Sequence, residues 1–147
     1  MKHLIICVFA LALLFPLALL AETYGIEGVW YNAGKTSKVQ IYKTSTGTYA
    51  GKIVWLKETK DPNGKPRADL KNPDENLRSR PLMNLVVVKG LVSKGSNKYD
   101  SGTIYDPKSG NTYSSKAEVT GPNTLKLRGF IGISLVGRTE TWTRATN

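Results

Sequence analysis

Residues 102–131, GTIYDPKSGNTYSSKAEVTGPNTLKLRGFI, contain three short segments in which apolar and polar residues alternate, separated by two turn sequences. Alternation with a period of two is typical of a β-strand that buries one face. Asp106-Pro107-Lys108-Ser109-Gly110 has Pro where a type I turn needs a fixed φ, and Gly where φ becomes positive. Gly121-Pro122-Asn123 forms the second turn. The stretch therefore predicts three consecutive antiparallel strands: Gly102–Tyr105, Thr112–Val119 and Thr124–Ile131.

The same pattern extends in both directions along the chain. It predicts further strands at Ile26–Tyr31, Lys38–Lys43, Tyr49–Leu56, Leu85–Val92 and Val136–Arg144. Eight short antiparallel strands are the right number for a small barrel, in which closure of the sheet removes its exposed edges. We therefore predict an all-β fold, an eight-stranded antiparallel up-and-down barrel. An open sandwich of two sheets is the alternative.

The connection between the third and fourth strands, residues 57–84, is much longer than the others and holds 12 charged residues. Long connections without regular structure are uncommon in compact domains and are usually functional or disordered. Asn72 is a suitable N-cap, Pro73 suits the first helical position, and Pro81 ends the segment. These residues predict one short helix at Pro73–Ser79. The helix either lies across one barrel mouth or belongs to a solvated loop.

The first 21 residues, MKHLIICVFALALLFPLALLA, have a basic start, an apolar run and a final small residue, which is the pattern of a secretory signal peptide. We expect an exported protein, periplasmic or secreted, in which residues 22–147 form a single barrel domain. Loss of Lys2 with the leader lowers the formal net charge from +10 to +9. After the leader, no apolar run is long enough for a transmembrane helix.

Removal of the leader also removes Cys7 and His3, the only cysteine and histidine of the chain. Disulfides, thiolate zinc sites, His-ligated haem and Ser-His-Asp triads are then excluded. Carboxylates remain as candidates for catalysis, but Asp106 opens a turn that its own side chain would cap. The acids of residues 57–84 lie among Lys and Arg, and ion pairing explains them. We therefore expect no enzyme activity, no cofactor and no metal site.

Gly28-Val29-Trp30 lies in the first expected strand, with Gly28 and Trp30 on one face. Trp30 is expected to fill one end of the barrel, and Gly28 to let another strand approach closely. This G-x-W resembles the start of lipocalin and avidin barrels, in which a final-strand Arg or Lys stacks on the indole. Such a cation–π contact contributes about 0.5–2 kcal/mol. Arg144 and Arg138 are the candidates for that cation.

The last expected strand has two candidate inner faces. Arg138, Glu140, Trp142 and Arg144 share one face, and Gly137 with three threonines forms the other. An inward Trp142 brings an Arg–Glu–Arg row into the barrel, inward threonines make a small polar lumen, and a bulge would mix the two. In the first case Glu140 is expected to neutralise the arginines, or one arginine stays free to bind a carboxylate or phosphate. The residues expected to close the barrel are Gly28, Trp30, Trp142 and Arg144.

Four longer strings, in the same order along the chain, resemble domain-of-unknown-function family 2147, a family of small exported bacterial proteins. The strings are Asn72-Pro73 with Leu77–Leu82, Tyr105–Tyr113, Leu127–Gly132 and Gly137–Arg144. Together with Gly28-Val29-Trp30, they cover nearly all of the chain after the leader. The resemblance implies a lipocalin-like barrel in an exported bacterial protein, and it implies no reaction.

Two hypotheses of function follow. The first is a binding module for a small amphiphilic or anionic ligand held by Arg80, Arg128 and Arg138, because these arginines lie in the family-like strings and offer bidentate recognition. The second is a structural or interaction protein of the cell envelope, whose lumen is filled by inward side chains such as Trp30, Ile53, Trp55, Tyr113 and Val119. The basic residues are scattered in sequence, and export favours an anionic envelope component over nucleic acid as the partner.

Overall fold

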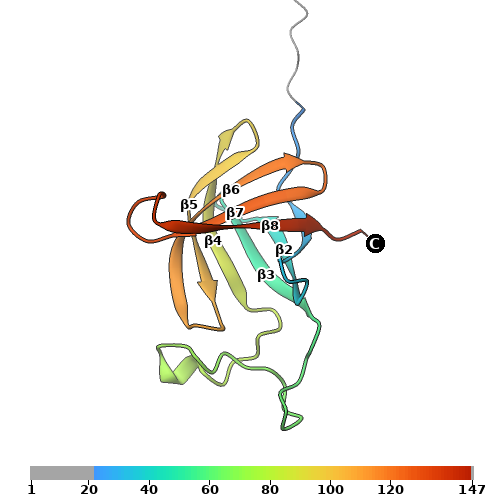
Figure 1. Cartoon of the computed structure of the whole chain (residues 1–147), viewed down its shortest axis with the longest axis vertical. Coiled ribbons are helices and arrows are strands. Elements are labelled where there is room, and N and C mark those ends of the chain that lie inside the picture. The colour runs from blue at the N-terminus through green and yellow to red at the C-terminus, as the bar shows by residue number, and fades with distance from the viewer. Residues whose placement is uncertain (1–21, 147) are drawn as a thin grey trace, which may run out of the picture.

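The computed structural model describes residues 22–146, whose eight antiparallel strands close into a barrel (Figure 1). Each strand pairs with its neighbours in the chain, and β1 also pairs with β8, so the predicted up-and-down barrel is confirmed. The expected signal peptide, residues 1–21, lies outside the described residues. The strands are β1 Gly28–Tyr31, β2 Ser37–Lys43, β3 Tyr49–Leu56, β4 Val86–Gly95, β5 Lys98–Asp106, β6 Asn111–Gly121, β7 Thr124–Phe130 and β8 Gly137–Arg144.

The middle of the barrel is filled by apolar side chains from the inner face of the strands. The most deeply buried of them include Trp30, Ile41, Val88, Leu91 and Leu125. Packing is tight enough that a Cβ added at Gly102 would lie 2.7 Å from Leu91 Cδ2, closer than real side chains approach. Within residues 22–146 there is no helix of the length and apolar character that spanning a membrane would take.

Trp55 points away from the lumen, contrary to the expectation that it fills it. The β2–β3 register shifts between Lys38 and Val39, so that Lys38 pairs with Trp55 but Val39 pairs with Ile53. An extra residue at a bulge reverses the alternation of inward and outward side chains beyond it. Trp55 is accordingly 36% exposed. It packs edge-on against Tyr31, with the ring centroids 5.9 Å apart.

The hairpin of β4 and β5 is longer than the sequence pattern predicts and projects at the top of Figure 1. Ser96 and Asn97 have φ of 51° and 62°, which forms a two-residue turn that matches the twist of the strands. Such turns usually contain Gly, so Ser96-Asn97 is a weak turn signal. Ser101, with φ 62°, interrupts the alternation of inward and outward residues in β5. The sequence pattern therefore predicts only the part of β5 that follows Ser101.

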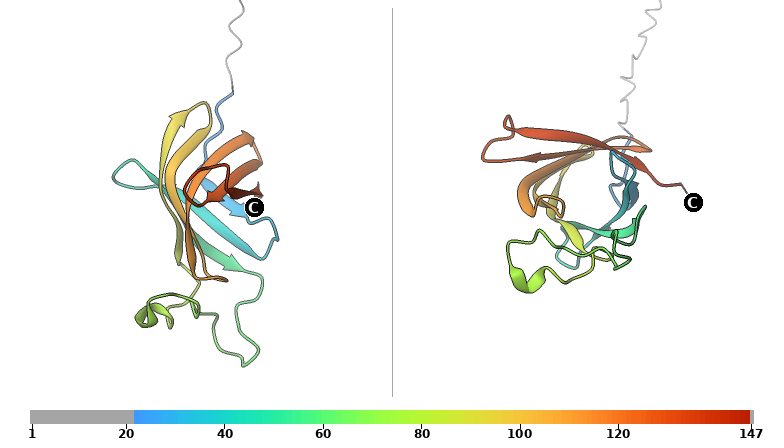
Figure 2. Two further views of the ribbon diagram at one scale, coloured as in Figure 1. Left: turned by 60° about the vertical axis from the view of Figure 1, so that its left-hand side comes forward. Right: turned by 60° about the horizontal axis from the view of Figure 1, so that its bottom comes forward.

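Residues 57–84 lie at the opposite end of the molecule, below the barrel in Figure 1 and in front of it in the right-hand view of Figure 2. They contain a single 3₁₀ turn, η1, at Glu75–Leu77, which is shorter than the predicted helix. Its N-cap is Asp74, whose carboxylate accepts a hydrogen bond from the Asn76 N–H at 3.0 Å. Asn72 is not the N-cap, because the turn begins later than predicted. Its Oδ1 accepts a hydrogen bond from the Asp74 N–H at 2.8 Å, and its amide donates to the carboxylate of Asp69.

Candidate functional site

One end of the barrel is closed by Trp30 and Arg144. Trp30 is 0% exposed, and its indole N–H donates to the carbonyl of Ile26 at 2.8 Å. The Arg144 guanidinium lies 4.1 Å from the centroid of the Trp30 ring. A Cβ at Gly28, where φ is 135°, would collide with Arg144 Nη1. The guanidinium also donates to three carbonyl oxygens at 2.7–2.8 Å, those of Gly25, Glu27 and Pro122.

This arrangement makes Arg144 a structural residue. Each of its three nitrogens donates to a backbone carbonyl, and one face of the guanidinium lies on the indole, so the group holds three segments of the fold together. Arg144 joins the segment before β1, the β6–β7 turn and β8. Because only Trp30–Arg144 and Tyr31–Thr143 pair between β1 and β8, these side-chain contacts reinforce the shortest seam of the barrel.

The register of β8 decides which of its faces is inward. Trp142 is buried opposite Leu125, and the strand pairs with β7 without a shift, so the threonines of β8 face outward. The Trp142 indole N–H donates to Glu140 at 3.2 Å. Within residues 22–146, Glu140 makes no ion pair with Arg138 or Arg144. The expectation that it neutralises these arginines is wrong, because Arg144 is satisfied by carbonyl groups instead.

Arg80 belongs to a buried polar cluster that attaches residues 57–84 to the barrel. Asp69 is fully buried, and its Oδ2 accepts hydrogen bonds from Arg80 Nε at 2.9 Å and Asn72 Nδ2 at 2.8 Å. Its Oδ1 accepts from the Tyr105 hydroxyl at 2.5 Å. Burial, together with this hydrogen bond, raises the pKa of Tyr105 above its ordinary value. Arg80 therefore compensates a buried carboxylate, which cannot remain unpaired without a large cost.

The three arginines proposed as a ligand site do not line a common groove. Arg80 borders an open groove of about 590 Å³ beside β4. Arg128 borders a second groove, which lies over β6 and β7. Arg128 donates from Nε to the carbonyl of Ser134 at 2.6 Å and from Nη1 to Thr139 at 2.9 Å. Arg138 is exposed and pairs in register with Gly129, but it borders neither groove.

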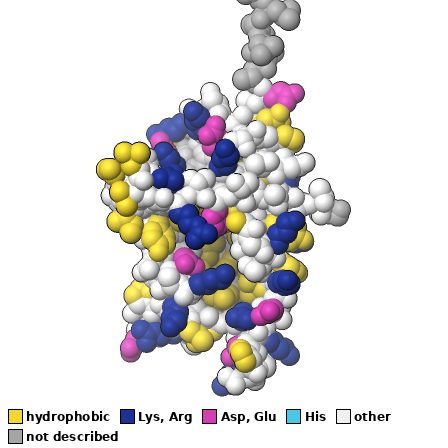
Figure 3. All heavy atoms as spheres, in the orientation of Figure 1, with side chains coloured by type: hydrophobic (Ala, Val, Ile, Leu, Met, Phe, Trp, Pro, Cys, Tyr) yellow, Lys and Arg dark blue, Asp and Glu magenta, His cyan; other side chains and the backbone are white. Residues whose placement is uncertain are grey.

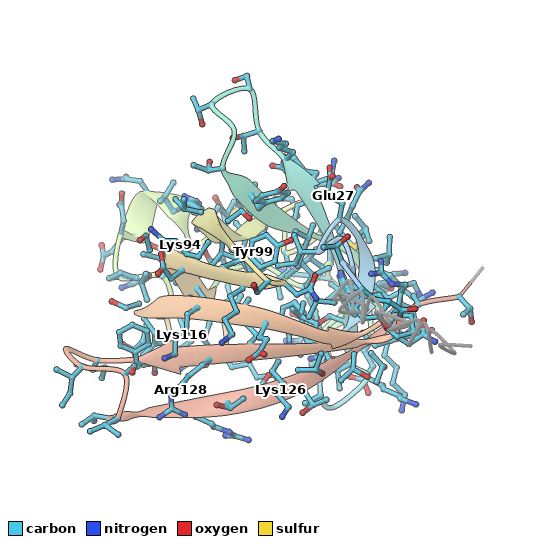
Figure 4. All side chains as sticks on the ribbon, turned by 90° about the horizontal axis from the view of Figure 1, so that it is seen from above. Glu27, Lys94, Tyr99, Lys116, Lys126 and Arg128 are labelled. Atoms are coloured by element: carbon cyan, nitrogen blue, oxygen red, sulfur yellow. The ribbon has the colours of Figure 1, made fainter. Side chains whose placement is uncertain are left out.

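The second groove, which we call the basic groove, has a volume of about 410 Å³ and lies between the β4–β5 hairpin and the outer face of β6 and β7. Figure 4 shows Lys116, Lys126 and Arg128 along one side of these strands, with Lys94 across from them. Its charged lining residues comprise five cations and two carboxylates: Lys94, Lys98, Lys116, Lys126, Arg128, Asp100 and Glu118.

Strand register produces this concentration of charge. Lys116 lies opposite Arg128, a pairing of like charges across β6 and β7, and Glu118 lies opposite Lys126. Among the described lining residues of the groove, one ion pair forms, between Lys94 and Asp100 at 3.5 Å. Like charges on adjacent strands repel each other. An anion bound in the groove would relieve that repulsion.

The sequence pattern contained part of this information. Lys126 and Arg128 are two residues apart in one strand, and Lys116 and Glu118 are two apart in another, so each pair shares the outer face of its strand. Alternation does not indicate which residues become neighbours on adjacent strands. The register and the projecting β4–β5 hairpin were needed to bring these scattered cations into one groove.

Comparison with known proteins agrees with the fold. The family model described as "Uncharacterized protein conserved in bacteria (DUF2147)" matches residues 28–144. No curated protein matches the chain. A solved structure from Helicobacter pylori, of a protein described as belonging to the lipocalin family, is similar with a TM-score of 0.72. The two chains are 21% identical, and the similarity covers 85% of this chain and 86% of that one. The barrel is therefore lipocalin-like.

Proposed function

The chain belongs to the DUF2147 family of bacterial proteins, and we propose that it is an exported, non-catalytic binding protein for an anionic ligand that occupies the basic groove. The observation that carries the proposal is the excess of cations over carboxylates in one groove of about 410 Å³. That volume lies within the range of roughly 300–1,000 Å³ that is usual for small-molecule sites.

The basic groove is a better candidate than the lumen. Buried side chains from all around the barrel fill its middle, and they are almost entirely apolar. By contrast, the groove offers ammonium groups, and the chain without its expected leader carries a formal net charge of +9 that attracts anions from a distance. Binding is therefore expected to weaken as ionic strength rises.

The proposal of a binding role without catalysis rests on the carboxylates. Asp69 already accepts hydrogen bonds from Arg80, Asn72 and Tyr105. Asp106 accepts from the Lys108 N–H at 3.0 Å within its own turn. Neither carboxylate borders the basic groove, and both are engaged in hydrogen bonds within the fold.

Isothermal titration calorimetry with dodecyl phosphate, below its micelle concentration, tests the proposal. The Lys116→Gln/Lys126→Gln variant removes two cations of the groove. A matched control, Lys57→Gln/Lys108→Gln, removes two exposed lysines outside it, so that the net charge is the same in both variants.

We expect the unaltered protein and the control to bind with similar affinity, and the groove variant to bind about 5–30-fold more weakly. That range corresponds to about 0.5–1 kcal/mol for each ammonium–phosphate contact at an exposed site. Dodecyl maltoside, which has a neutral headgroup, should bind poorly to all three proteins. Equal losses in the two variants, or no binding by the unaltered protein, would reject the proposal.

The filled barrel interior favours a second candidate, a structural or interaction protein of the cell envelope without a small ligand. That candidate predicts no saturable heat for either amphiphile with any of the three proteins.

A further inference from the structure

The loop between β7 and β8 exposes a compact group of aliphatic side chains. Ile131, Ile133, Leu135 and Val136 are 67%, 63%, 85% and 60% exposed. Half of the large hydrophobic side chains exposed in the described chain therefore lie within six consecutive residues. In Figure 3 hydrophobic side chains gather at the upper left, where Figure 1 places this loop. Contiguous exposed apolar surface of this kind marks an interaction site, whereas scattered single residues do not.

The loop is held in a defined conformation that keeps these side chains outward. The Ile131 N–H donates to the carbonyl of Val136, and the Val136 N–H to that of Ile133, each at 3.0 Å. Arg128 donates to the carbonyls of Ser134, at 2.6 Å, and Leu135, at 3.3 Å. Four carbonyl groups and two N–H groups of the loop are thus bonded within the molecule, and the aliphatic side chains form its outer surface.

Cations lie beside the base of the apolar loop. Arg128 both supports the loop and borders the basic groove, Lys116 lies opposite it, and Arg138 follows the loop by two residues. An apolar tip bordered by Lys and Arg matches the surface of an anionic bilayer, in which acyl chains lie directly beneath negatively charged headgroups. A protruding loop of flexible aliphatic side chains suits a fluid phase, because lipid requires no complementary shape.

We propose that residues 131–136 insert into the surface of an anionic bilayer, and that the basic groove binds the headgroup of an anionic lipid in that bilayer. The inference rests on the proposed function, since it names the chemical class of the anion that occupies the groove. Apolar contact by the loop and charge contact by the groove are separate contributions, and two signals together give stable membrane attachment where one gives only marginal attachment.

Vesicle co-sedimentation tests the inference. The sucrose-loaded vesicles contain either phosphatidylcholine alone or phosphatidylcholine with about 30% phosphatidylglycerol, whose anionic headgroups attract basic protein surfaces. Leu135→Ser removes the most exposed side chain of the loop. Leu70→Ser is the matched control, because Leu70 is 64% exposed in residues 57–84, away from the loop. Circular dichroism establishes that both variants are folded.

We expect the unaltered protein and Leu70→Ser to sediment with the anionic vesicles and much less with the neutral ones. Leu135→Ser should lower the partition coefficient at least fivefold but leave dodecyl phosphate affinity unchanged, and Lys116→Gln/Lys126→Gln should lower both. If dodecyl phosphate binds in the groove but Leu135→Ser has no effect on sedimentation, the membrane inference falls while the proposed function survives. If vesicle binding depends on Leu135 but not on the two lysines, the assignment of the headgroup to the groove is overturned.

The alternative partner for the exposed loop is a second copy of the chain. Analytical ultracentrifugation without lipid would then show a dimer that Leu135→Ser converts to a monomer, and that result would also overturn the inference.

Discussion

Replacement of Trp30 by Ala should destabilise the barrel more than replacement of the partly exposed Trp55. Trp30 is 0% exposed, and truncation of a buried Trp or Phe costs about 3–5 kcal/mol through lost transfer energy and the cavity left behind. The variant also loses the hydrogen bond to the Ile26 carbonyl and the ring beneath Arg144. These losses place the expected cost at the upper end, about 5 kcal/mol.

A loss of that size is comparable with the whole stability of a small domain, about 5–15 kcal/mol. Urea unfolding followed by far-UV circular dichroism measures the loss in the free energy of unfolding. A thermal melt should show the melting temperature lowered by about 15–25 °C, at roughly 3–5 °C per kcal/mol. Trp30→Phe keeps an aromatic ring under the guanidinium and should cost about 1–3 kcal/mol.

Trp55→Ala is the matched control, because it removes the same side chain from the outer face, where Trp55 is 36% exposed. Its cost should be about 0.5–1.5 kcal/mol, since only part of the indole leaves a protein environment. If Trp30→Ala and Trp55→Ala shift the unfolding midpoint equally, the reasoning that Trp30 closes the barrel is refuted.

Two further predictions concern the cation at the barrel end and the buried cluster. Arg144→Lys should lower the free energy of unfolding by about 1–3 kcal/mol, because an ammonium cannot replace both the three carbonyl contacts and the planar stack on Trp30. Arg138→Lys, at an exposed position, should change it by less than about 0.5 kcal/mol. Urea unfolding of both variants measures the difference, and equal effects would contradict the prediction. Because the pKa of Tyr105 is raised in the folded state, its stabilising contribution is complete below about pH 10, the ordinary value, and is lost as the pH rises through the folded value. Thermal melts between pH 8 and 11 should therefore show a steeper loss of stability in the unaltered protein than in Tyr105→Phe, and parallel curves would contradict the assignment.

The barrel and its closed end were predictable from local sequence pattern. Alternation with a period of two specifies which face of a strand is buried, and the Pro- and Gly-containing turns specify where each strand ends. Eight such segments leave few arrangements for the chain, and closure is the one that removes exposed edges. The pattern also identified Trp30 as an inward residue, because its strand is short and contains no bulge.

Other features depended on contacts between residues far apart in the chain. Arg80 and Tyr105 both bond to Asp69, from 11 and 36 residues away. No local pattern specifies that meeting. Trp55 turned outward because a bulge shifted the register between β2 and β3, and a bulge reverses faces without a clear sequence signal.

The candidate site shows the same division. The sequence by itself determined that Lys116 lies on the outer face of one strand, and Lys126 and Arg128 on that of the next, because alternation is a property of each strand alone. Only the tertiary structure decided that these cations face each other and that the β4–β5 hairpin completes a groove around them. Register and hairpin twist arise from hydrogen bonding and packing between strands, which the order of residues within one strand does not specify.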